Sequence, residues 1–114
     1  MKYIRRQIEN DLKYAFQHYK ILLITGARQV GKTRLIKELF GSVKYINFDN
    51  IFYENEAKND GILFLNNNGK PLVLDEVQRV PEIFRSIKYL CDEEDKYSQY
   101  ILSGSQLFKL MNEA

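Results

Sequence analysis

The residues best suited to chemistry form one short run with fixed spacing. Residues 26–33 read GARQVGKT, which matches the phosphate-binding P-loop pattern GxxxxGK[ST]. Backbone N–H groups of such a loop converge on closely spaced phosphate oxygens, and its glycines permit the close approach. The run therefore predicts a site for a nucleoside triphosphate, and a glycine-rich turn without a ligand is the alternative.

The polar residues of this run have separate expected roles. The Lys32 ammonium should contact the β and γ phosphate oxygens, and the Thr33 hydroxyl should ligate Mg²⁺. A helix beginning near Gly31 would direct its unpaired N–H groups at the same phosphates. The predicted nucleotide-binding residues are the run and the arginine that follows it, namely Gly26, Ala27, Arg28, Gln29, Val30, Gly31, Lys32, Thr33 and Arg34.

Two consecutive carboxylates end an apolar stretch later in the chain. Residues 71–77 read PLVLDEV, so Asp75 would lie at the carboxyl end of a parallel strand, where ligands bind. Asp75 is the predicted partner of Mg²⁺, through water. Glu76 is the predicted catalytic residue that orients the attacking water or accepts its proton. An acidic pair alone is a weak signal, and the P-loop upstream makes it a strong one.

A serine lies at the end of the last apolar run. Ser103 in ILSGS would reach the γ-phosphate or the attacking water if its strand lies between the first and third strands. It is therefore a third predicted catalytic residue, with Lys32 and Glu76. The alternative is a serine-glycine turn in which Ser105 caps a helix, and the sequence leaves both interpretations open.

Strands and helices alternate around these residues. Short apolar runs predict four buried strands at residues 21–25, 43–48, 71–77 and 100–105. Apolar stripes predict helices over residues 4–19, 31–40, 51–58, 62–65 and 81–91, with the acidic residues 92–95 in a loop and the start of a further helix after residue 105. The alternation predicts an α/β fold, with a parallel sheet and right-handed crossovers.

Composition excludes several classes of protein. The 114 residues suffice for one domain, and 17 basic against 15 acidic residues give a net charge of +2, so a polybasic nucleic-acid surface is not indicated. A single Cys and a single His provide neither a disulfide nor a zinc cluster, which favours the cytoplasm. No apolar stretch approaches the roughly 18 residues of a membrane span.

The ordered set GARQVGKT, YINFD, PLVLDEVQRVPEIF and YILSGSQLF resembles the AAA-type P-loop ATPases of bacteria and archaea, whose N-terminal ATPase domain precedes a C-terminal domain of unknown function. The resemblance covers residues 20–112. It implies a sheet ordered 5-1-4-3-2 and ATP with Mg²⁺ as ligand. It also implies Walker A roles for Lys32 and Thr33, Walker B roles for Asp75 and Glu76, and a sensor role for Ser103.

The sequence departs from this family by ending directly after the fourth predicted strand. We therefore expect residues 1–114 to form one three-layer ATPase domain, truncated at its C-terminal end, with helices on both faces and strands ordered 1-4-3-2 without the fifth. The first strand would be a sheet edge with unpaired backbone groups, which predicts self-association through it. A missing C-terminal domain or a protein partner is the other predicted contact.

The predicted function is ATP binding with Mg²⁺-dependent hydrolysis, coupled to an absent domain or a partner. The sequence contains no NKxD motif of the kind that reads guanine, and no basic lid typical of small-molecule kinases. The alternative is a non-catalytic module in which ATP orders an interaction surface. Glu76 favours hydrolysis, whereas the truncation favours the binding module.

Overall fold

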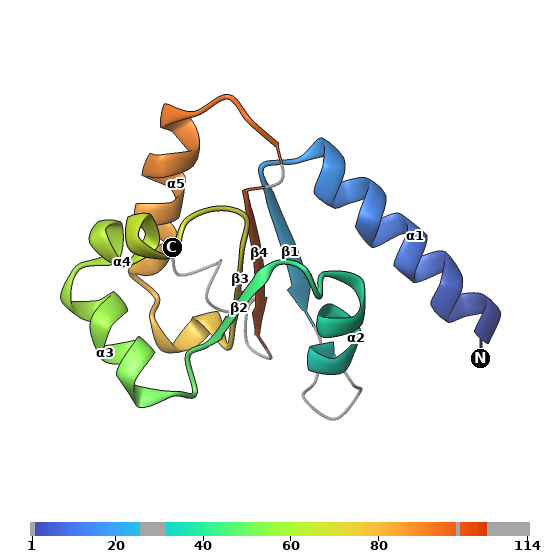
Figure 1. Ribbon diagram of the computed structural model, residues 1–114, viewed down its shortest axis with the longest axis horizontal. Coiled ribbons are helices and arrows are strands. Elements are labelled where there is room, and N and C mark those ends of the chain that lie inside the picture. Colours follow the sequence, from blue (N-terminus) through green and yellow to red (C-terminus); the bar gives the residue numbers. More distant parts are fainter. Residues whose placement is uncertain (1, 26–31, 98, 105–114) are drawn as a thin grey trace.

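The computed structural model describes residues 2–25, 32–97 and 99–104, and its strands form one parallel sheet (Figure 1). The strands are β1 (Ile21–Thr25), β2 (Lys44–Asn47), β3 (Leu72–Asp75) and β4 (Tyr100–Gly104). Their order is β1-β4-β3-β2, and every neighbouring pair is parallel. The α/β fold and the strand order expected from the sequence are therefore confirmed.

The helices of the described part are α1 (Lys2–His18), α2 (Lys32–Leu39), α3 (Ile51–Asn59), α4 (Gly61–Asn68) and α5 (Ile83–Glu93), with a 3-10 turn η2 (Val77–Arg79) after β3. Asp60 separates α3 from α4, as the predicted break at residues 59–61 required. Its carboxylate accepts a hydrogen bond from the Leu63 backbone N–H at 3.1 Å and so caps α4.

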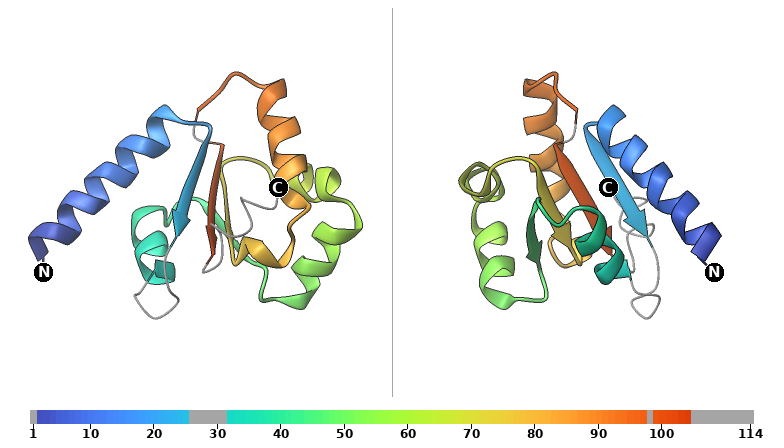
Figure 2. Two further views of the ribbon diagram at one scale, coloured as in Figure 1. Left: turned by 180° about the vertical axis from the view of Figure 1, so that it is seen from behind. Right: turned by 45° about the vertical axis from the view of Figure 1, so that its right-hand side comes forward.

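The larger core lies between the sheet and α3, α4 and α5 (Figure 2). From β2, β3 and β4 it takes the side chains that point to this face, which are Ile46, Leu72, Leu74, Tyr100 and Leu102. The Phe48 and Phe64 rings pack in the same core, with a centroid distance of 5.7 Å. Burial of alternate strand residues on this face requires the other residues of each strand to face the opposite side.

The second core lies between the opposite face of the sheet and α1 and α2. Its buried members are Leu22, Ile24, Ile36, Phe40, Val73 and Ile101. Phe16 of α1 packs edge-on against Phe40, with ring centroids 5.1 Å apart. The sheet is thus covered by helices on both faces, which gives the three layers expected from the sequence and positions α2 beside the carboxyl ends of the strands (Figures 1 and 2).

Two of the element boundaries that differ from the sequence prediction involve acidic residues. The strand predicted over residues 71–77 ends at Asp75, because Glu76 adopts a left-handed conformation (φ 54°, ψ 44°) that no extended strand can contain. Helix α5 continues through Asp92 and Glu93, which were predicted to lie in a loop. Both carboxylates are exposed, so water screens them from the helix C-terminus, and buried Cys91 extends the apolar stripe into the last turn.

None of the helices within the described ranges is both long enough and apolar enough to cross a membrane.

Candidate functional site

The carboxyl ends of three strands bring polar side chains to the α2 face of the sheet. Register pairs Asn47 of β2 with Asp75 of β3, and Leu74 of β3 with Leu102 of β4. Because successive residues alternate between faces, Asp75 lies on the same side as Val73, and Ser103 on the same side as Ile101. The sheet therefore places these two predicted site residues next to each other.

Asp75 is the centre of this arrangement, and it is fully buried. Its Oδ1 accepts hydrogen bonds from the Ser103 hydroxyl at 2.6 Å and from the Glu76 backbone N–H at 2.9 Å. Its Oδ2 accepts from the Thr33 hydroxyl at 2.9 Å and from the Tyr45 hydroxyl at 2.5 Å. These donors compensate the cost of burying the carboxylate and fix the orientation of both of its oxygens.

Thr33 lies in the first turn of α2, and its hydroxyl reaches the predicted Walker B aspartate directly. The hydroxyl uses its proton for Asp75, so its oxygen lone pairs remain for a cation. A threonine hydroxyl next to an aspartate is the hard oxygen donor set that Mg²⁺ takes when substrate phosphates supply further ligands. The side chains of Thr33 and Asp75 therefore fit the predicted metal role.

Of the remaining predicted nucleotide-binding residues, the structure describes the side chain of Arg34 alone. Residues 26–31 lie outside the described part of the chain, as does the side chain of Lys32, although Lys32 begins α2. The Arg34 side chain is exposed and pairs with Glu38 one turn later, with 3.2 Å between Nε and Oε1. The structure therefore does not bring the Arg34 side chain to Asp75.

Ser103 is fully buried and donates to Asp75, so its side chain faces the same site as Thr33. This geometry corresponds to the first of the two interpretations of ILSGS, in which the strand end carries a site residue. Ser105, the helix cap of the second interpretation, lies outside the described residues.

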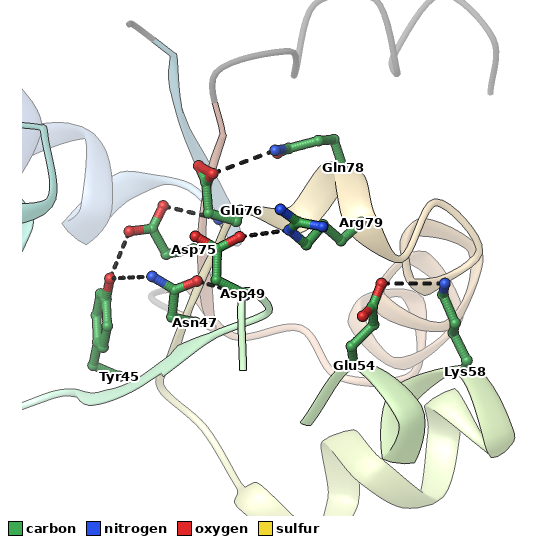
Figure 3. Close-up of polar contacts among 9 residues, drawn as sticks. All are labelled: Tyr45, Asn47, Asp49, Glu54, Lys58, Asp75, Glu76, Gln78 and Arg79. Atoms are coloured by element: carbon green, nitrogen blue, oxygen red, sulfur yellow. Dashed lines mark hydrogen bonds and ion pairs between the residues drawn. The ribbon is translucent and has the colours of Figure 1, made fainter. Parts of the chain in front are cut away.

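Glu76 is only 3% exposed and follows directly on Asp75 (Figure 3). Its left-handed backbone turns the chain sharply into η2, and the Arg79 N–H closes that turn on the Glu76 carbonyl at 3.2 Å. The Glu76 carboxylate faces the Gln78 side chain, with 3.5 Å between Oε2 and Nε2. The predicted catalytic carboxylate is thus held at the strand end, beside the predicted metal partner.

Tyr45 is a site residue that the sequence analysis did not single out. Its hydroxyl donates to Asp75 and accepts from the Asn47 side-chain amide at 3.3 Å (Figure 3). Burial, followed by the hydrogen bond to Asp75 and the charge of Asp75, raises the pKa of the Tyr45 phenol. The phenol therefore stays protonated at neutral pH and acts as a donor. The alternation of Tyr45 and Asn47 in a strand ending beside Asp75 was the available signal.

An ion pair between Arg79 and Asp49 lies next to the site. Arg79 of η2 contacts Asp49, which follows β2, with 2.5 Å between Nε and Oδ1 (Figure 3). The Asp49 N–H in turn donates to the Asn47 side chain at 2.8 Å. These contacts join the segment after β2 to the segment after β3.

Comparison with known proteins identifies relatives of this chain. The AAA domain family matches residues 18–114. An uncharacterized protein of Mycobacterium tuberculosis and one of Mycobacterium bovis are each 30% identical over 105 residues, which is 89% of this chain and 23% of theirs. The chain thus spans about a quarter of the length of these relatives. No solved structure matches it significantly. Since the family match covers most of the sequence, the chain belongs to the AAA domain family of nucleotide-binding ATPases.

Proposed function

We propose that the protein binds ATP together with Mg²⁺ and hydrolyses it at the carboxyl ends of β1, β3 and β4. The observation that carries this proposal is the convergence of the Thr33 and Ser103 hydroxyls on the buried carboxylate of Asp75. The three side chains come from α2, β4 and β3, so their meeting is a property of the fold. It supports a site in which oxygen ligands surround a cation beside a phosphate chain.

In this proposal the binding residues act through charge and hydrogen bonding. Backbone N–H groups of residues 26–31 and the N-terminus of α2 donate to the phosphate oxygens, and the Lys32 ammonium pairs with the β and γ phosphates. Thr33 and Asp75 are the residues that would hold Mg²⁺, Asp75 through water, and the ion would neutralise charge on the β and γ phosphates.

Hydrolysis then requires one water and one base. The water oxygen forms a bond to the γ-phosphorus as the bond from that phosphorus to the bridging β–γ oxygen breaks, and Glu76 accepts the proton that the water loses. ADP leaves with the bridging oxygen, and the γ-phosphoryl group becomes inorganic phosphate. The Ser103 hydroxyl, which donates to Asp75 in the structure, would donate to the γ-phosphate or to the attacking water when ATP is bound.

The proposal extends to what ATP hydrolysis drives and to the compartment in which it occurs. Because the chain spans 23% of its relatives' length, we propose that hydrolysis drives a conformational change in a further domain or in a partner protein. We assign the reaction to the cytoplasm, on the grounds that the single cysteine, Cys91, is a free buried thiol.

Calorimetric titration of the protein with ATP, with and without Mg²⁺, tests the binding step. We expect Mg²⁺-dependent binding that Lys32→Ala abolishes. Lys58→Ala is the matched control, because it removes the same charge from an exposed lysine that pairs with Glu54 and lies apart from Asp75 (Figure 3). Absence of ATP binding by the folded protein would refute the proposal.

Phosphate release in the same samples separates the two candidate functions. Release that depends on Mg²⁺ supports an ATPase. Tight binding without release would instead support the non-catalytic module, in which ATP orders an interaction surface.

A further inference from the structure

We propose that Gln78 is a positioning residue that holds the Glu76 carboxylate toward the reacting water, and that Gly104 provides the space in which the Gln78 amide lies. The inference rests on the proposed function, because Glu76 is the base of that reaction. It concerns two residues, in η2 and β4, that have no other assigned part in the chemistry.

The first observation is the direction of the Gln78 amide. Its Nε2 is 3.5 Å from Oε2 of Glu76, and the two side chains point toward one another (Figure 3). A contact of this length is a loose hydrogen bond, of the kind that shortens when a catalytic site closes on its substrate. The reverse amide orientation would set two oxygens against each other, so the carboxylate itself fixes which end of the amide faces it.

The second observation is that the other end of the same amide has no partner among the residues that the structure describes. Gln78 Oε1 is buried and accepts no hydrogen bond from residues 2–25, 32–97 or 99–104. An orphaned buried acceptor lowers stability, so the Gln78 amide does not serve the fold well. Its useful contact is the one that its Nε2 makes with Glu76.

Gln99 provides a comparison for this interpretation. Its Oε1 also has no partner in the described part of the chain, but its Nε2 donates to the Lys96 carbonyl at 2.7 Å and the Glu94 carbonyl at 3.2 Å, which secures the segment before β4. The Gln99 amide therefore has an evident structural role. The Gln78 amide donates instead to the Glu76 carboxylate at the site.

The third observation is the position of Gly104 at the end of β4. A Cβ atom at residue 104 would lie 2.2 Å from Gln78 Oε1, which is far inside contact distance. The amide can therefore occupy its position only because residue 104 has no side chain. Gly104 follows Ser103, which donates to Asp75. The Gln78 amide therefore lies between Glu76, which follows β3, and Gly104, at the end of β4.

Kinetics test the positioning role. Gln78→Met keeps the length of the side chain and removes both the donor and the orphaned acceptor. We expect kcat to fall about tenfold with the KM for ATP within about twofold, since the lost contact orients a base and does not touch ATP. Gly104→Ala should give the same pattern, because the added methyl displaces the far end of a flexible side chain and leaves the fold intact.

A structural role alone would give a different result. It would lower the unfolding midpoint of Gln78→Met while leaving kcat per folded molecule unchanged, and that outcome overturns the proposal. Unchanged kcat in Gly104→Ala overturns it as well.

NMR spectroscopy of the nucleotide-free protein tests the contact without any turnover. Glu76→Ala should shift the side-chain NH₂ signals of Gln78 and leave those of Gln99 in place. Unmoved Gln78 signals overturn the inference whether or not the protein hydrolyses ATP. If the wild type releases no phosphate although Gln78 responds to Glu76→Ala, the proposed hydrolysis fails while the contact stands.

Discussion

Removal of the Tyr45 hydroxyl should destabilise the nucleotide-free protein, because that hydroxyl donates to a buried charge. The O–O distance to Asp75 is 2.5 Å, and Asp75 is fully buried. A hydrogen bond to a charged group contributes about 1.5–3 kcal/mol. We therefore expect Tyr45→Phe to lower the free energy of unfolding by about 2 kcal/mol at neutral pH, the midpoint of that range. Asn47 loses its acceptor too, but its side chain is only partly buried and can turn to water.

The same substitution should change how stability depends on alkaline pH. The pKa of Tyr45 in the folded protein lies above its ordinary value of 10.0, chiefly through burial and then through Asp75. Its stabilising contribution is therefore complete below about pH 10 and is lost as the pH rises from there toward the folded pKa. The wild type should lose up to about 1.4 kcal/mol per pH unit in that window from this group, less where water reaches the phenol.

Urea unfolding followed by circular dichroism, at about pH 7, 10 and 11, measures both effects. The difference in unfolding free energy between wild type and Tyr45→Phe should narrow above about pH 10. The other tyrosines are common to both proteins and cancel in the comparison. A difference below about 0.5 kcal/mol at neutral pH, or one that widens toward pH 11, would refute the reasoning.

Three further predictions concern other parts of the structure. Tyr100→Phe removes a buried hydroxyl that has no hydrogen-bond partner within the described ranges, so the unfolding free energy in urea should stay level or rise by about 1 kcal/mol, and a fall of that size would contradict the assignment. Asp60→Ala removes the cap of α4 and should cost about 1 kcal/mol in the same assay, whereas no loss would mean that the Asp60–Leu63 contact is not stabilising. We also propose that β1, an edge of the described sheet, pairs with a second copy of the chain; Leu23→Lys should then reduce the dimer fraction in sedimentation experiments, and a monomeric wild type would exclude the pairing.

The strand positions were predictable because each buried strand is a short apolar run between turn signals. The strand order was predicted from the resemblance to the AAA-type ATPases and not from the apolar runs. The runs at residues 21–25 and 100–105 differ from the observed strands by one residue at most. The end of β3 was less predictable, because Val77 is apolar and buried although it lies beyond the strand. The pattern of apolar residues indicates which residues are buried. It does not indicate that the Glu76 backbone adopts a left-handed conformation.

The candidate site was predictable to the extent that its residues belong to motifs. Thr33 was predicted from the P-loop pattern, and Asp75 and Ser103 from their places at the carboxyl ends of strands. The structure brings the three together. Tyr45 and Gln78 lie in the YINFD and PLVLDEVQRVPEIF segments that carry the family resemblance, but neither was given a role at the site. Their contacts depend on the β2–β3 register and on the turn after Glu76. Such contacts are set by tertiary geometry, which a spacing pattern does not encode.

The proposed function requires Glu76 to act as the base of ATP hydrolysis. The decisive measurement is phosphate release at saturating ATP and Mg²⁺ by the wild type and by Glu76→Gln, with ATP binding of both proteins measured in parallel. We expect Glu76→Gln to bind ATP as the wild type does while its turnover falls by about 100-fold or more. Turnover of Glu76→Gln at the wild-type rate would contradict this role of Glu76.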